Sequence, residues 1–131
     1  MMENQTTILL VDDDVDYLFQ TKLHLEKSGF KVVTVDSQKE VEELIQTFKP
    51  DLAIFDLMME KEDSGFILCY RMKRKFPDVP IILLTAVSAE TGLVFGVNSE
   101  DERKWIRADL YLEKGIGYDQ LYKQIIKLLK R

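Results

Sequence analysis

Five short aliphatic runs, separated by stretches with helical spacing, are the feature that most constrains how this chain can fold. The runs occupy residues 7–11, 31–35, 52–55, 80–85 and 108–112. Their length and β-branched content favour strands, and the runs without polar alternation are typical of strands covered on both faces. Strands that alternate with helices predict a parallel sheet between two layers of helices.

The stretches between the runs carry signals for where helices begin and end. Ser37 and Glu40 form a capping-box pair in front of the second helix. Gly29 is placed to end the first helix, and Pro77 follows the third. The apolar stripe of the second helix is predicted at Val41, Leu44, Ile45 and Phe48. The stripe of the last helix is predicted at Leu121, Ile125, Leu128 and Leu129.

The bulk composition fits a single domain over residues 1–131, with one irregular or inserted segment at about 88–107. A net charge of −5 without a basic patch argues against direct contact with nucleic acid. No apolar run approaches the roughly 18 residues that a membrane span needs, and the N-terminus lacks the features of a signal peptide. The lone Cys69 fits a reducing compartment. We therefore expect a cytoplasmic domain without a membrane or nucleic-acid partner.

Acidic side chains gather where the first and third strands are predicted to end. Asp12 and Asp13 follow the first run, and Asp56 follows the third. Ligands of a parallel α/β sheet bind beyond the carboxyl ends of its strands. If these two strands are neighbours, about 4.8 Å apart, the three carboxylates converge, and they then need protons or a cation. A hard divalent ion such as Mg²⁺ suits oxygen ligands of this kind.

Two more residues at the same edge extend this chemistry. Thr85 ends the fourth run, and Lys114 comes just after the fifth. An aspartate can act as a nucleophile and form an acyl phosphate. The charge on the transferred phosphoryl group is then balanced by a metal on one side and by a cation such as Lys114 on the other. Thr85 can donate a hydroxyl hydrogen bond to a phosphoryl oxygen, so the set indicates phosphoryl transfer.

Simpler interpretations apply to the rest of the acidic run. Asp14 and Asp16 are interpreted as solvated carboxylates, with Asp14 also placed to cap the first helix. A calcium loop of the EF-hand type that starts at Asp12 is excluded. Tyr17 stands at its required glycine position, and Leu23 stands at its final glutamate.

Four segments resemble, in the same order, motifs of the receiver domain of two-component response regulators. They are "LLVDDD", "PDLAIFDLMM", "IILLTA" and "ADLYLEK", and the resemblance covers nearly the whole chain. It implies an α/β fold of the flavodoxin-like, receiver type. In that fold a five-stranded parallel sheet of order 2-1-3-4-5 is flanked by helices on both faces.

The resemblance also implies a role for each site residue. The implied roles are the phosphoacceptor at Asp56, Mg²⁺ ligands at Asp12, Asp13, Asp56 and the Met58 carbonyl, phosphoryl contacts at Thr85 and Lys114, and a switch pair at Thr85 and Tyr111. Tyr111 is equally compatible with plain packing, because aromatic residues are common in strands. A receiver is a signalling phosphoacceptor, not an enzyme, and catalyses at most its own phosphoryl transfer and slow autodephosphorylation.

The partners that the resemblance implies are a sensor histidine kinase or phosphotransfer protein, which donates from a phosphohistidine, and a downstream effector protein. No effector domain follows Arg131, so output is expected through another protein unless the chain is part of a larger regulator. The segment 88–107 is expected to serve as the recognition surface. Within it, Trp105 is either a packing anchor or an exposed contact.

The chain departs from the family pattern at three places. Gly115 follows the lysine, where receivers usually have a proline in a cis peptide. The loop after Asp56 lacks a customary proline and has Ser64 inserted before Gly65. The stretch from Thr85 to Lys114 is longer than usual. None of these departures removes a chemical group from the predicted site.

Three other functions are alternatives to the receiver interpretation. A receiver-shaped interaction module that is not phosphorylated is the main alternative, kept open by Gly115 but opposed by the intact acidic set. A metal-dependent phosphatase with an aspartyl nucleophile typically has a second carboxylate two residues later, where this chain has Met58. A flavodoxin-like cofactor protein is disfavoured, because carboxylates after the first strand would repel a phosphate.

Overall fold

The computed structural model describes residues 5–57, 64–85 and 108–130. The segment 88–107 and its Trp105 lie outside these residues, and so does Met58. The elements, in chain order, are β1 (Thr7–Val11), α1 (Val15–Lys27), β2 (Lys31–Val35), α2 (Gln38–Leu44), β3 (Leu52–Asp56), α3 (Ser64–Lys75), β4 (Ile81–Thr85), β5 (Leu110–Glu113) and α5 (Tyr118–Lys130).

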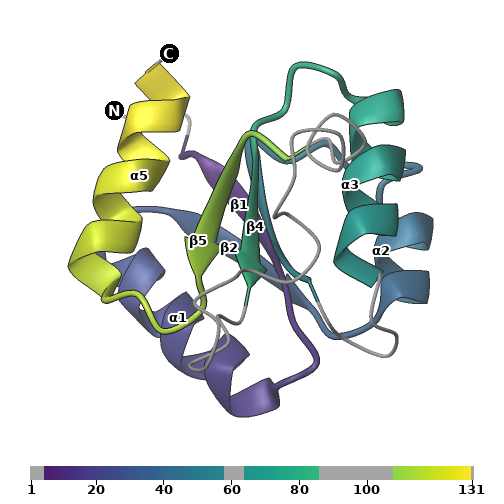
Figure 1. Cartoon of the computed structure of the whole chain (residues 1–131). Coiled ribbons are helices and arrows are strands. Elements are labelled where there is room, and N and C mark those ends of the chain that lie inside the picture. The colour runs from purple at the N-terminus through teal and green to yellow at the C-terminus, as the bar shows by residue number, and fades with distance from the viewer. Residues whose placement is uncertain (1–4, 58–63, 86–107, 131) are drawn as a thin grey trace, which may run out of the picture.

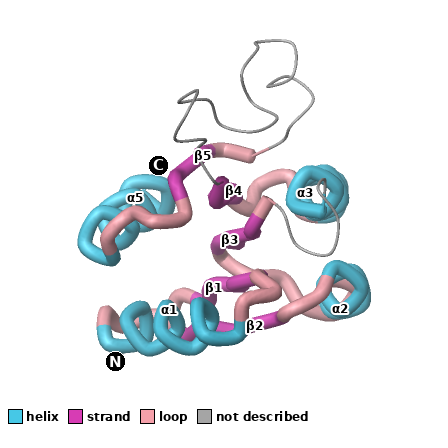
Figure 2. Tube along the Cα trace, turned by 60° about the horizontal axis from the view of Figure 1, so that its bottom comes forward, coloured by secondary structure: helices cyan, strands magenta, loops and turns pink. Residues whose placement is uncertain are grey.

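The five strands, drawn as arrows in Figure 1, form one parallel sheet in the order β2-β1-β3-β4-β5, which confirms the predicted order (Figure 2). Figure 2 shows α1 and α5 on one face of the sheet and α2 and α3 on the other. The strands β1 and β3 are hydrogen-bonded neighbours, with Val11 opposite Phe55. The chain order therefore brings the ends of the first and third strands side by side, as the site prediction requires.

Side chains along each central strand point alternately to the two faces of the sheet and so contribute to two hydrophobic cores. Ile8 and Leu10 of β1 pack with α1 and α5, whereas Leu9 and Val11 pack with α2 and α3. All four of these side chains have no exposed surface. A strand buried on both faces needs apolar residues at every position, which explains why the sequence shows unbroken aliphatic runs here.

The helix ends follow the predicted signals. The N-cap of α1 is Asp14, whose carboxylate accepts a hydrogen bond from the Tyr17 amide at 3.2 Å. Ser37 caps α2 by accepting from the Glu40 amide, also at 3.2 Å. Gly29 follows the end of α1 with a φ of 102°, a left-handed conformation that glycine adopts without a steric penalty.

Several element boundaries differ from the sequence prediction. The helix α2 ends at Leu44 with Ile45 as its C-cap, so Phe48 lies beyond the helix that its spacing predicts. The next residue but one is Pro50, which disfavours helical conformation at the preceding position and limits how far the helix can extend. The strand β5 begins at Leu110, two residues later than predicted. Asp109 in front of it is held by hydrogen bonds to Ile81.

No helix in the described ranges is long and apolar enough to cross a lipid bilayer.

Candidate functional site

Three carboxylates meet at the carboxyl edge of the sheet, where β1 and β3 end. Asp12 follows β1 directly and has no exposed surface, and Asp56 is the last residue of β3 and is 6% exposed. Asp13 is exposed at the mouth of the site. Each residue offers an oxygen that lies within 4.8 Å of the other two. The structure therefore brings together the three aspartates that the sequence analysis selected.

Lys114, which follows β5, is the cation that faces these carboxylates. Its Nζ lies 2.8 Å from Asp12 Oδ2 and 3.5 Å from Asp56 Oδ2. Burial lowers the pKa of Lys114, but the contacts with Asp12 and Asp56 outweigh this effect and raise the pKa above its ordinary value. The ammonium therefore stays charged, and among the residues that the structure describes it is one positive charge beside three negative ones.

The pKa of Asp56 shows that this compensation is incomplete. Burial and the neighbouring charge of Asp12 raise the pKa of Asp56 from 3.8 to about 6, although Lys114 opposes the shift. Asp13 adds a further repulsive contribution. A carboxylate with a raised pKa gains most from an additional cation, because the cation offsets both the burial and the repulsion.

The donor set fits a hard divalent cation. All three aspartates contribute oxygen atoms, which Mg²⁺ prefers. Asp12 Oδ1 accepts a hydrogen bond from the Asp14 amide at 2.9 Å, which orients the carboxylate. Asp12 Oδ2 is fully buried, and beyond its 2.8 Å ion pair with Lys114 it has no partner among the described residues. This oxygen therefore keeps a free acceptor site. Met58, the predicted fourth ligand, lies outside the described residues, so its role stays a prediction.

Thr85 and Tyr111 lie on the neighbouring strands β4 and β5. Thr85 is buried at the end of β4, and its hydroxyl donates a hydrogen bond to the Leu112 carbonyl at 3.4 Å. Its own carbonyl accepts from the Lys114 amide at 2.9 Å, which ties the lysine backbone to the end of β4. Tyr111 pairs in register with Leu83 and packs against the core on the α2 and α3 face.

Gly115 does not disturb the placement of Lys114. The described residues contain no cis peptide bond, so the lysine reaches the carboxylates on a trans backbone. A methyl group added at Gly115 would meet no atom within 4 Å.

Two residues at the site were not singled out by the sequence analysis. Gly65, in the first turn of α3, donates its amide to the Leu57 carbonyl at 2.8 Å. A Cβ at Gly65 would lie 2.7 Å from the Asp56 carbonyl oxygen and 2.5 Å from Leu57 Cα. Only glycine permits this close packing of α3 against the end of β3. The sequence signal that could have identified Gly65 is its position at the start of a helix, directly after the loop that follows Asp56.

Tyr17 of α1 is the second such residue. The Lys114 ammonium lies 5.0 Å from the centre of the Tyr17 ring, within the range of a cation–π interaction. Burial raises the pKa of the Tyr17 hydroxyl to about 12. Tyr17 therefore stays neutral and presents its ring to the lysine, and no spacing rule in the sequence reveals this contact.

Comparison with known proteins places this geometry in a family. A family model for the response regulator receiver domain matches residues 8–126. The transcriptional regulatory protein GltR of Pseudomonas aeruginosa is 35% identical over 133 residues, which cover 100% of this chain and 52% of that protein. The alkaline phosphatase synthesis transcriptional regulatory protein PhoP of Bacillus subtilis is 30% identical over 124 residues, which cover 95% of this chain and 48% of that protein. The chain thus spans about half the length of these relatives.

Solved structures with the same fold are also similar over nearly the whole chain. A two-component response regulator from Clostridium difficile superimposes with a TM-score of 0.79 at 25% identity, covering 97% of this chain and 98% of that one. The response regulator protein TrrA of Thermotoga maritima, solved in complex with Mg²⁺ and BeF, gives a TM-score of 0.77 at 27% identity, with 95% and 99% covered. The chain belongs to the response regulator receiver domains, the phosphoacceptor modules of two-component signal transduction.

Proposed function

We propose that Asp56 is the phosphoacceptor and that Asp12, Asp13 and Asp56 hold the Mg²⁺ ion on which the transfer depends. The observation that supports this proposal is the convergence of three carboxylates within 4.8 Å, of which Asp12 and Asp56 pair with Lys114. The Mg²⁺ complex of TrrA is consistent with the same ion here. The unphosphorylated interaction module is not favoured, because the acidic set, Thr85 and Lys114 are all in place.

The proposed reaction is an in-line phosphoryl transfer. A carboxylate oxygen of Asp56 attacks the phosphorus of a phosphohistidine, an O–P bond forms, and the N–P bond to the histidine breaks. A bound Mg²⁺ would neutralise charge on the phosphoryl oxygens. Lys114, held by Asp12, would contact another phosphoryl oxygen. The donor is a sensor histidine kinase or a phosphotransfer protein, and a cytoplasmic location follows from that partnership.

The switch that we propose begins at Thr85. Its hydroxyl donates to the Leu112 carbonyl in the structure described, and a phosphoryl group on Asp56 would offer a charged acceptor in its place. Movement of Thr85 toward the phosphoryl group would free space for Tyr111 on the adjacent strand. The changed surface would then be read by a downstream effector protein, with the segment 88–107 as part of the recognition surface.

Mass spectrometry after incubation with acetyl phosphate tests the acceptor directly. The wild type should gain one phosphoryl group in the presence of Mg²⁺ and none after chelation, and Asp56→Asn should abolish the gain. Asp16→Asn is the matched control, because Asp16 is an exposed aspartate on α1 outside the cluster. Equal labelling of the wild type and Asp56→Asn would contradict the assignment.

A further inference from the structure

The strand β2 forms one edge of the sheet and leaves one of its sides open. In the part of the chain that the structure describes, β2 pairs only with β1. The Lys31 amide donates a hydrogen bond to the Thr6 carbonyl, and the Val35 carbonyl accepts one from the Asp12 amide. Both groups therefore point toward β1. Peptide groups alternate in direction along a strand, so the amide and carbonyl of Thr34 point away from the sheet. These outward groups are a template for another strand.

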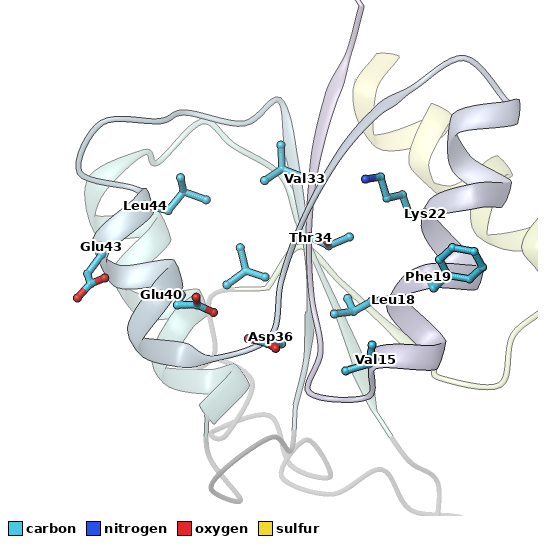
Figure 3. A pocket seen from close by; sticks show the side chains of 11 residues that line it. Val15, Leu18, Phe19, Lys22, Val33, Thr34, Asp36, Glu40, Glu43 and Leu44 are labelled. Carbon is cyan, nitrogen blue, oxygen red and sulfur yellow. The ribbon is translucent and has the colours of Figure 1, made fainter.

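A groove runs along this open side, between α1 on one face of the sheet and α2 on the other (Figure 3). Its volume is about 820 Å³, enough for several side chains. On the α1 wall, Val15 and Phe19 are 64% and 68% exposed, which is unusual for large apolar residues. On the α2 wall, Val33 and Leu44 contribute apolar surface. We call this feature the β2-edge groove.

The two walls of the β2-edge groove differ in charge. The α2 wall carries the carboxylates of Asp36, Glu40 and Glu43, all exposed. The α1 wall is apolar, with Lys22 as its charged residue. An added strand points alternate side chains toward opposite faces of the sheet. Its residues that face α1 would therefore meet apolar surface, and its residues that face α2 would meet negative charge.

The β2 edge has few of the features that normally prevent the addition of another strand, which are prolines, bulges and charged side chains. The β2 sequence "KVVTV" contains no proline, and its register with β1 runs without a bulge. Its only charge is Lys31, at the start of the strand. We propose that the β2-edge groove binds an extended segment of a partner protein, in which apolar residues alternate with lysine or arginine, as a sixth strand of the sheet.

A second copy of this chain fits the groove less well. Two β2 strands paired about a two-fold axis perpendicular to the sheet would keep both α2 walls on the same face. The carboxylates of Asp36, Glu40 and Glu43 would then face the same carboxylates of the other copy. Like charges opposite one another are destabilising, so the charge pattern favours a basic partner.

Two synthetic peptides test the proposal. The probe has the sequence Gly-Ser-Val-Lys-Val-Lys-Val-Lys-Val-Gly-Ser, and its control replaces every lysine with glutamate. The lysine peptide should bind about tenfold tighter in fluorescence anisotropy at low salt, since its lysines would face the carboxylates of the α2 wall, which would repel the glutamates of the control. Hydrogen exchange should show new protection of the Thr34 amide when the lysine peptide is bound. Equal affinity of the two peptides, or an unprotected Thr34 amide, would overturn the proposal.

Variants of the protein then locate the binding surface. Phe19→Ser and the double change Glu40→Lys with Glu43→Lys should each weaken binding of the lysine peptide at least threefold, and the double change should strengthen binding of the glutamate peptide. Leu23→Ser is the matched control, because Leu23 is 44% exposed on the same helix but does not line the groove. An equal effect of Leu23→Ser and Phe19→Ser would place the peptide elsewhere. A concentration-dependent dimer in sedimentation that the double change strengthens would assign the groove to a second copy instead.

Discussion

The aspartates at the two ends of the sheet differ in how fully their charges are compensated by hydrogen-bond donors and cations. At the amino end, Asp51 accepts a hydrogen bond from the Thr7 amide at 2.8 Å, and Asp109 accepts from the Ile81 amide at 2.7 Å. Asp109 also pairs with Lys73 at 2.7 Å. At the carboxyl end, Asp12, Asp13 and Asp56 lie close together, and among the described residues only Lys114 pairs with any of them, namely with Asp12 and Asp56. Carboxylates whose charge is matched by donors hold the fold together, and carboxylates left in excess are available to a metal and a phosphoryl group.

The largest effect is expected from Gly65→Ala, which forces a side chain against the backbone of the acceptor strand. The new Cβ would lie 2.5 Å from Leu57 Cα, so α3 or the end of β3 must move. Overpacking of this kind costs about 1–3 kcal/mol, and the displaced Asp56 should also slow labelling by acetyl phosphate. Denaturant unfolding and mass spectrometry measure the two effects. Gly115→Ala is the control, since open space surrounds that position and its stability should stay within about 0.5 kcal/mol of the wild type.

Loss of one excess carboxylate should weaken the metal site. Asp13→Asn removes an anionic ligand of a hard cation, and we expect the dissociation constant for Mg²⁺ to rise at least about tenfold. Isothermal titration calorimetry measures the change. Asp51→Asn is the control, because Asp51 lies at the opposite, amino end of the sheet, and it should leave the affinity for Mg²⁺ unaltered. If the two variants lose affinity equally, the excess charge at the carboxyl end does not form the metal site.

The raised pKa of Asp56 predicts a stability change with a definite dependence on pH. In the presence of a chelator, Asp56→Asn should raise the free energy of unfolding by about 2 kcal/mol at pH 7.5. The folded protein holds the Asp56 proton more tightly than the unfolded chain does, because the folded pKa is about 6 and the ordinary value is 3.8. The wild type therefore loses stability relative to the variant as pH rises from about 4 to about 6.

Urea unfolding of both proteins across this pH range checks the prediction. The difference between the variant and the wild type should shrink toward zero as the pH falls to about 3, where the carboxyl group is largely protonated in both states. Saturating Mg²⁺ should reduce the difference at pH 7.5. A difference that is constant with pH would mean that a lost contact, not the charge, distinguishes the two proteins.

The sequence predicted the carboxyl end of the sheet better than the rest of the molecule, for a physical reason. The convergence of Asp12 and Asp56 depends on where two strands stop, which the aliphatic runs predict, and on strand order, which the resemblance to receiver domains implied. The close approach of Gly65 and the ring of Tyr17 over Lys114 depend on how helices pack onto the sheet, which leaves no periodic signal. The end of α2 was misplaced for the same reason, since apolar spacing continues into the turn that follows Leu44.

The contacts of Asp109 at the amino end of the sheet were not predicted from the sequence either. The smallest expected effect concerns these contacts. Asp109→Ala removes the acceptor of the Ile81 amide and one partner of Lys73, which keeps its hydrogen bond to the Val79 carbonyl at 2.8 Å. Because the Asp109 side chain is 37% exposed, water can replace part of the loss, and we expect a cost of about 1 kcal/mol in the free energy of unfolding. Asp109→Asn should recover part of this cost, since the amide oxygen can still accept from Ile81. Neither variant should change labelling of Asp56 by acetyl phosphate. A loss of labelling without a loss of stability would show that the two ends are coupled, and the division between structural and functional aspartates would then fail.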